Sequence, residues 1–96
     1  MKAALVYSHK SLLQGRYVLE MEIHQVGKSA RYRDGVKSGL VLVDLHTEKK
    51  VLMDNHHPKG PHVHLNDREV AYHYTGEDSL IRDFKTLVLE HMGVKI

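Results

Sequence analysis

The chain has 96 residues, a formal net charge of +2 with histidine counted as neutral, and no cysteine. This length predicts a single domain over residues 1–96, because two smaller pieces could not each bury a core. A content of 42% hydrophobic and 27% charged residues is typical of a globular fold. The lack of cysteine excludes disulfide scaffolds, thiolate nucleophiles and zinc–thiolate sites.

The net charge and the N-terminal segment indicate the cellular compartment and the kinds of partner to expect. No segment approaches the roughly 20 apolar residues of a membrane span, and Ser8-His9-Lys10 interrupts the first apolar run. We therefore expect a cytoplasmic protein without a signal peptide and without a membrane partner. The mildly basic charge is compatible with RNA, DNA or an acidic protein partner and requires none of them.

The first third of the chain predicts strands and a loop. Residues 3–7 are a short strand candidate, and residues 8–15 supply a turn. Apolar and polar residues alternate over residues 17–24, which predicts a strand with one buried and one solvent-exposed face. Residues 27–38 are polar and basic and are expected to form a loop.

The middle of the chain continues this strand pattern. The apolar run 40–43 predicts a central strand covered on both faces, joined to residues 51–53 by a hairpin at Thr47-Glu48. Residues 54–64 contain two prolines and a glycine, so we expect a loop attached to the end of a strand. Residues 69–74 predict one more strand.

A C-terminal helix is the clearest expected element. Thr75-Gly76-Glu77-Asp78 resembles a capping box, and Gly93 is a natural stop. Between them, one face carries apolar residues and a histidine at helical spacing: Leu80, Ile81, Phe84, Leu87, Val88 and His91. The sequence therefore predicts an α+β fold, with a four- to five-stranded, mainly antiparallel sheet and this helix packed on one face.

Four of the nine histidines lie between residues 56 and 64. Histidine changes its charge near neutral pH, so it can serve as an acid, a base, a cation or a metal ligand. In an extended segment, His62 and His64 point to the same side with their Cα atoms roughly 6.5–7 Å apart. One could act as base on a ribose 2′-hydroxyl and another as acid on the leaving 5′-oxygen.

Two other interpretations of this segment remain open. The same two imidazoles could share a metal ion, with Asp54, His56 or His57 as further ligands. Alternatively, the histidines only form hydrogen bonds within a surface loop. Asp54 and Asn55 could likewise have either a functional or a structural role, because Asx residues commonly end strands by bonding to their own backbone.

We assign roles on the acid–base interpretation. Asp54 would orient a histidine through its ring N–H, and Lys59 would stabilise phosphoryl oxygens. Neither a metal nor a cofactor is expected, and a metal-independent ribonuclease is the first hypothesis for an activity. The expected catalytic residues are His62, His64, Asp54 and His57, and the expected substrate-binding residues are Lys59, Asn55, Arg31 and Arg33.

The second half of the chain contains an ordered series of short motifs. The series consists of an Asp-Asn strand end, a Lys-Gly loop, His-x-His, a Glu–Tyr strand and a helix with Asp-Phe. Its residues are Asp54, Asn55, Lys59, Gly60, His62, His64, Glu69, Tyr72, Asp83 and Phe84. This series resembles the TumE-like toxins of prokaryotic toxin–antitoxin modules, and residues 19–26 fit the first half of that family. This chain has Val63 where family members often carry arginine.

The resemblance implies a toxin component of a toxin–antitoxin module. Its implied partner is a DNA-binding antitoxin encoded nearby, and RNA is the implied target of an RNA-cleaving or RNA-binding toxin. The competing hypotheses are a non-enzymatic protein-interaction module and a metal-binding protein that uses the same histidines. A homodimer is left open.

Overall fold

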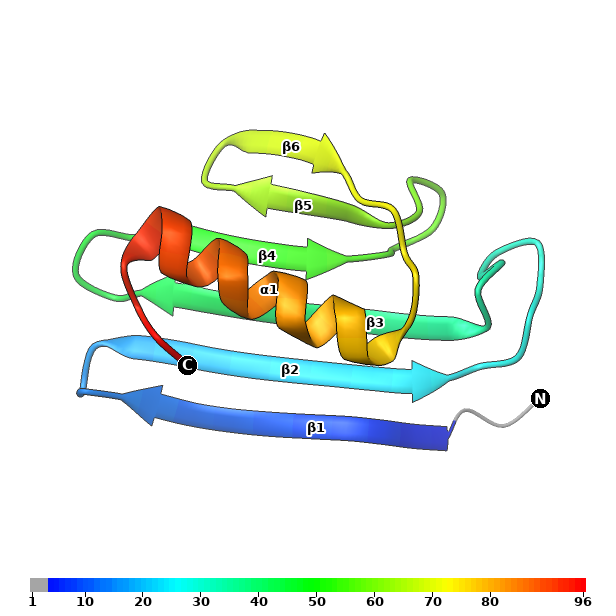
Figure 1. Cartoon of the computed structure of the whole chain (residues 1–96), viewed down its shortest axis with the longest axis horizontal. Coiled ribbons are helices and arrows are strands. Elements are labelled where there is room, and N and C mark those ends of the chain that lie inside the picture. Colours follow the sequence, from blue (N-terminus) through cyan, green and yellow to red (C-terminus); the bar gives the residue numbers. More distant parts are fainter. Residues whose placement is uncertain (1–3) are drawn as a thin grey trace.

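The computed structural model describes residues 4–96, which form one six-stranded antiparallel sheet and one helix (Figure 1). The order of strands in the sheet is the order in the chain, so each strand pairs with the next. The elements are β1 (Ala4–Leu13), β2 (Tyr17–Gln25), β3 (Val36–Asp44), β4 (Lys50–Asp54), β5 (His62–Leu65), β6 (Arg68–Ala71) and α1 (Glu77–Met92).

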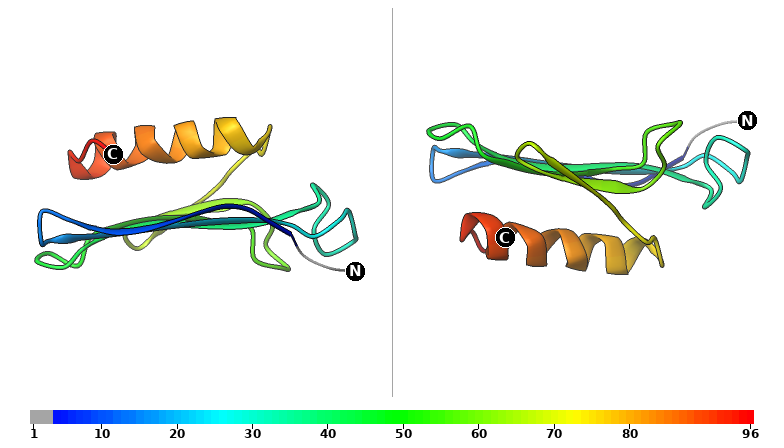
Figure 2. Two further views of the ribbon diagram at one scale, coloured as in Figure 1. Left: turned by 90° about the horizontal axis from the view of Figure 1, so that it is seen from below. Right: turned by 90° about the horizontal axis from the view of Figure 1, so that it is seen from above.

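Residues 4–96 form two layers, and among them the helix covers one face of the sheet and nothing covers the other (Figure 2). Helix α1 lies across one face, and we call the opposite face of the sheet the open face. Side chains alternate between the faces along each strand. The core lies between the helix and the sheet and consists of Leu19, Met21, Ile23, Leu40, Leu42, Val51, Met53, Val63, Leu80, Phe84, Val88 and Val94.

The helix is held by its apolar stripe, as expected. Leu80, Phe84 and Val88 are buried against the sheet, and Ile81 and Leu87 pack beside them. These positions recur every three or four residues, which places them on one side of a helix. Gly93 ends α1 with φ of 68°, a left-handed conformation that glycine adopts without steric cost.

The α+β class, the antiparallel sheet and the packed helix are confirmed, whereas the expected number of strands is wrong. Residues 4–96 contain six strands, because residues 62–65 form β5 rather than part of a loop. Strand β1 is also longer than expected, since it continues through residues 8–13, which were expected to form a turn. The prolines expected to prevent strand pairing lie before β5, at positions 58 and 61. The first residue of the expected strand 3–7 lies outside the described residues.

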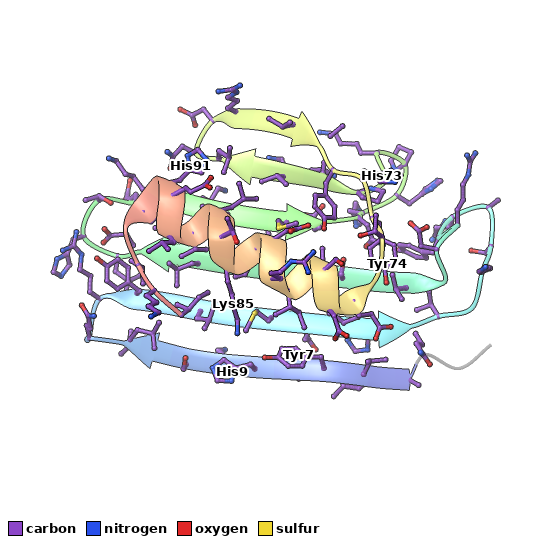
Figure 3. All side chains as sticks on the ribbon, in the orientation of Figure 1. Tyr7, His9, His73, Tyr74, Lys85 and His91 are labelled. Atoms are coloured by element: carbon purple, nitrogen blue, oxygen red, sulfur yellow. The ribbon has the colours of Figure 1, made fainter. Side chains whose placement is uncertain are left out.

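Other local expectations need correction. The run 40–43 is central, but the helix covers only one of its faces. The strand expected at 69–74 ends at Ala71. Gly76 caps α1 without a side-chain hydrogen bond, so the capping box does not form. His91 is exposed rather than packed in the apolar stripe, near the C-terminal end of α1 (Figure 3).

Within residues 4–96, α1 is too short and too polar to cross a membrane.

Candidate functional site

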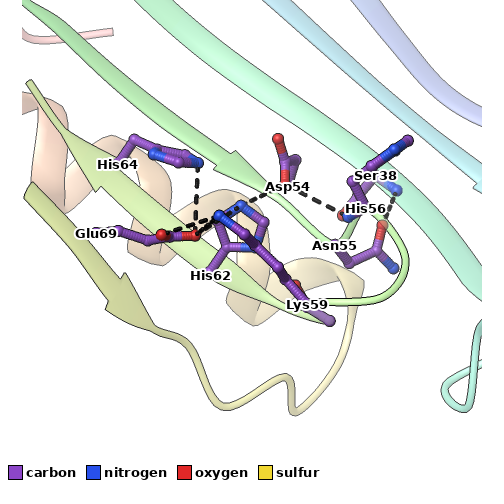
Figure 4. Close-up of polar contacts among 9 residues, drawn as sticks. Ser38, Asp54, Asn55, His56, Lys59, His62, His64 and Glu69 are labelled. Carbon is purple, nitrogen blue, oxygen red and sulfur yellow. Dashed lines mark hydrogen bonds and ion pairs between the residues drawn. The ribbon is translucent and has the colours of Figure 1, made fainter. Parts of the chain in front are cut away.

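Three of the four expected catalytic residues lie together on the open face (Figure 4). Asp54 ends β4 and is the register partner of His62 on β5, and His64 follows two residues later on the same face. One ligand atom from each of Asp54, His62 and His64 lies within 4.8 Å of the others. The fourth residue, His57, is exposed in the loop between β4 and β5.

His62 is fixed by polar contacts at both ring nitrogens. Nδ1 lies 2.7 Å from the carbonyl oxygen of Gly60. Because a carbonyl only accepts, Nδ1 must carry hydrogen and donate it. Nε2 lies 2.8 Å from Oδ1 of Asp54, within the distance of an ion pair. His62 is only 6% exposed, so its orientation is set by the protein rather than by water.

His64 complements this buried ring. Its ring lies edge-on to that of His62, with centroids 4.7 Å apart and an angle of 80° between the planes. His64 is more exposed than His62, with 27% of its side chain accessible compared with 7%. The site therefore combines one imidazole held between the Gly60 carbonyl and the Asp54 carboxylate with one that a molecule on the open face can reach.

Glu69 on β6 completes the cluster and was missing from the expected site. Its Oε1 lies 3.6 Å from Nε2 of His62 and 4.0 Å from Nε2 of His64. Lys59 forms an ion pair with the same carboxylate at 3.0 Å. The hydrogen bond from Lys59 holds the pKa of Glu69 below its ordinary value. We call Asp54, Lys59, His62, His64 and Glu69 the open-face cluster.

A two-residue hairpin explains how Glu69 reaches this site. Leu65 pairs with Arg68 across Asn66-Asp67, which places Glu69 directly opposite His64. Asn66 has φ of 59°, a conformation that asparagine tolerates in such turns. The sequence signal for this hairpin was Asn66-Asp67, which follows residues that alternate between histidine and apolar side chains. The signal was missed because residues 54–64 were interpreted as a loop.

Asn55, which was expected to bind substrate, uses its side chain in hydrogen bonds within the fold. Its side-chain nitrogen donates to the carbonyl of Val36, and its side-chain oxygen accepts from the backbone N–H of Ser38. The residue is buried. Both polar atoms therefore tie the end of β4 to the start of β3. The structural interpretation expected bonds to the residue's own backbone, and Asn55 instead bonds to the backbone of the neighbouring strand.

The expected arginines line a separate cavity at the end of the sheet. A cavity of about 470 Å³ lies between the β2–β3 and β4–β5 loops, and its lining includes Arg31, Arg33, His57 and Lys59. Asp34 is the acidic residue of this lining. Lys59 belongs both to this cavity and to the open-face cluster, so the two regions adjoin.

A second hollow lies on the open face itself. It has a volume of about 480 Å³, and its lining includes Glu20, Glu22, His24 and Lys37. Gly39 forms part of it and pairs with both Glu22 and Asp54. His24 contacts Glu22 at 3.3 Å, which gives a second histidine–carboxylate pair on the same face. With two glutamates and one lysine, this hollow is less favourable for a polyanion than the loop cavity.

Some residues of the motif series serve the fold. The hydroxyl of Tyr72 donates to Asp83 at 2.7 Å, which ties the segment after β6 to α1. Burial, followed by this hydrogen bond, raises the pKa of Tyr72. Phe84 lies in the core. The motif series therefore divides into the open-face cluster and a set of contacts that hold the sheet, the helix and the β4 end together.

Comparison with known protein families, with curated proteins and with solved structures finds no match for this chain.

Proposed function

We propose that the protein is the toxin component of a toxin–antitoxin module and that it cleaves RNA in the cytoplasm at the open-face cluster. The observation that carries the proposal is the pair His62 and His64, one clamped by Asp54 and Gly60 and the other accessible from the open face. The partner, a DNA-binding antitoxin encoded nearby, comes from the resemblance to TumE-like toxins alone.

Cleavage of an RNA phosphodiester needs two proton transfers. A neutral imidazole takes the proton of the ribose 2′-hydroxyl, which attacks the phosphorus. A charged imidazole then protonates the leaving 5′-oxygen. The Asp54 carboxylate lies 2.8 Å from Nε2 of His62, where it would stabilise a charged imidazole, and this supports the acid role for His62. His64 is more accessible and supports the role of base. Lys59 would stabilise the charge on the phosphoryl oxygens.

The distribution of charge favours one approach for the RNA backbone. Arg31, Arg33 and Lys59 line the loop cavity that adjoins the cluster. Glu20 and Glu22 line the hollow on the other side of Asp54. A polyanion is attracted to the first and repelled by the second. We therefore place the strand in the loop cavity, with one phosphodiester at the cluster.

The test is RNA cleavage by the purified protein and by single variants. His62→Ala and His64→Ala should each lower the cleavage rate by about 100-fold or more, the usual contribution of a positioned acid or base. Lys59→Ala should lower it less, because a lysine supplies charge but transfers no proton in this scheme. Cleavage should persist in the presence of a chelator.

The matched control is His24→Ala, which removes a carboxylate-paired histidine from the same face but outside the cluster. Cleavage should be unchanged in this variant. Circular dichroism and thermal unfolding would establish that each variant is folded. A folded, metal-free protein that leaves RNA intact while binding the neighbouring gene product would overturn the nuclease proposal. That result would favour the competing interaction module.

A further inference from the structure

We propose that Asp54, His62 and His64 bind a divalent transition-metal ion such as Zn²⁺, and that the bound ion switches off RNA cleavage at the cluster. The metal site rests on geometry alone. Its inhibitory effect rests on the proposed function as well. The ion would be bound by Nε2 of His62 and by the Asp54 carboxylate that lies beside it.

The distances between donor atoms are close to those of a metal site. Zinc lies about 2.0–2.2 Å from nitrogen and oxygen ligands, so two donors in a tetrahedral site are roughly 3.4 Å apart. Nε2 of His62 and Oδ1 of Asp54 are 2.8 Å apart, and donor atoms of all three residues lie within 4.8 Å. Side-chain rotations could close this set without a change in strand register. Two imidazoles with a carboxylate are a donor set that suits zinc and similar ions.

The support around His62 is the kind that metal-binding histidines need. A ligating imidazole usually donates its other N–H to a carbonyl or carboxylate, which fixes the tautomer and aims the ligating nitrogen. Nδ1 of His62 makes this bond to the carbonyl of Gly60. This bond leaves Nε2 as the nitrogen that would bind the ion, 2.8 Å from Oδ1 of Asp54.

Neighbouring charges give the site a second carboxylate. Oε1 of Glu69 is 3.6 Å from Nε2 of His62, close enough to become a fourth ligand. Lys59 holds this carboxylate in an ion pair and also places a positive charge beside the site. Lys59 therefore weakens metal binding in two ways, by competing for Glu69 and by repelling a cation.

Metal binding and proton transfer use the same nitrogen lone pairs. An ion held by His62 and His64 prevents one from accepting a proton and the other from carrying one. Occupancy should therefore inhibit cleavage, and a chelator should restore it. The opposite dependence, cleavage that needs the ion, would mean that metal-bound water does the chemistry.

The binding experiment uses untagged protein and Zn²⁺ alone, followed by calorimetry and by the ¹⁵N resonances of the histidine rings. One equivalent should bind, and the Nε2 signals of His62 and His64 should shift. His62→Ala and His64→Ala should each weaken binding by at least about 100-fold, while His24→Ala should leave it unchanged. Mg²⁺ should bind far more weakly, because it prefers oxygen ligands.

The Lys59→Met variant should bind Zn²⁺ more tightly than the unmodified protein. It releases Glu69 and removes the adjacent charge, and affinity for Zn²⁺ should rise roughly fivefold. Lys10→Met removes a lysine from β1, outside the cluster, and should have no effect. If His62→Ala does not fold, Asp54→Asn and the resonances of the unmodified protein give the same test.

The results separate the two proposals. Zinc binding at His62 and His64 in a protein that never cleaves RNA would keep the metal site and refute the proposed function. Cleavage without any zinc binding would refute the metal site and keep the function. Equal loss of zinc binding in His24→Ala, or ring shifts confined to His56 and His57, would overturn the site. Cleavage stimulated by Zn²⁺ would overturn the inhibitory role.

Discussion

Replacement of Phe84 by alanine should remove a large part of the stability of the fold. Phe84 is the only phenylalanine in the chain, and it is 0% exposed, midway along the apolar stripe of α1. A buried aromatic side chain removes about 150–250 Å² from water, equivalent to roughly 4–6 kcal/mol at 25 cal/mol per Å². Alanine keeps part of that burial, and the cavity that it leaves is costly. We therefore expect a loss of about 3–5 kcal/mol.

Urea denaturation followed by far-UV circular dichroism measures this loss. The control is Leu89→Ala, five residues further along α1, where the side chain is 51% exposed and the cost should be below about 1 kcal/mol. Small domains have about 5–15 kcal/mol of stability in total, so Phe84→Ala can approach complete unfolding. Phe84→Leu, expected to cost about 1–2 kcal/mol, keeps the series measurable. Equal midpoints for Phe84→Ala and Leu89→Ala would refute the packing described for the helix.

The other predictions concern two polar residues that support the fold. Two hydrogen bonds from Arg16 hold the pKa of Asp44 well below its ordinary value, so this carboxylate stabilises the fold above about pH 4, and the stabilisation is lost as the pH falls further. The difference in Tm between the unmodified protein and Asp44→Asn should therefore shrink from pH 7 to pH 3, and a constant difference would contradict this origin of stability. Asn55→Ala should cost about 1–3 kcal/mol, because it leaves polar backbone groups of Val36 and Ser38 without their partner. The folded fraction of Asn55→Ala should cleave RNA at the unmodified rate. A folded but inactive Asn55→Ala protein would mean that Asn55 contributes to the site, as first expected.

Periodicity predicted the parts of the fold that depend on one long pattern. The alternation over residues 17–24 identified β2, and the spacing around Phe84 identified the buried face of α1. Both patterns reflect a single buried surface. The same reasoning overestimated how much of β3 is covered, since an apolar run does not reveal whether a second layer exists.

The sequence was less informative where pairing between strands decides the structure. The length of β1 depends on its register with β2 rather than on its own apolar pattern, so its polar second half was taken for a turn. The two prolines of the His-rich segment concealed β5. Asp54, His62 and His64 were expected to lie together because Asp54 ends the strand that leads into the histidine-rich loop. Glu69 joins them through a hairpin register that composition alone does not specify.

The order of strands in the sheet has a consequence for how the protein folds. Each strand pairs with its neighbour in the chain, so the sheet can grow hairpin by hairpin with short loop closures, a topology associated with fast folding. Its apolar face, however, is covered by the last element in chain order. During synthesis the strands therefore leave the ribosome before the helix that shields them. Until α1 follows, the nascent sheet exposes Leu19, Leu40 and Val51 and is most prone to aggregation.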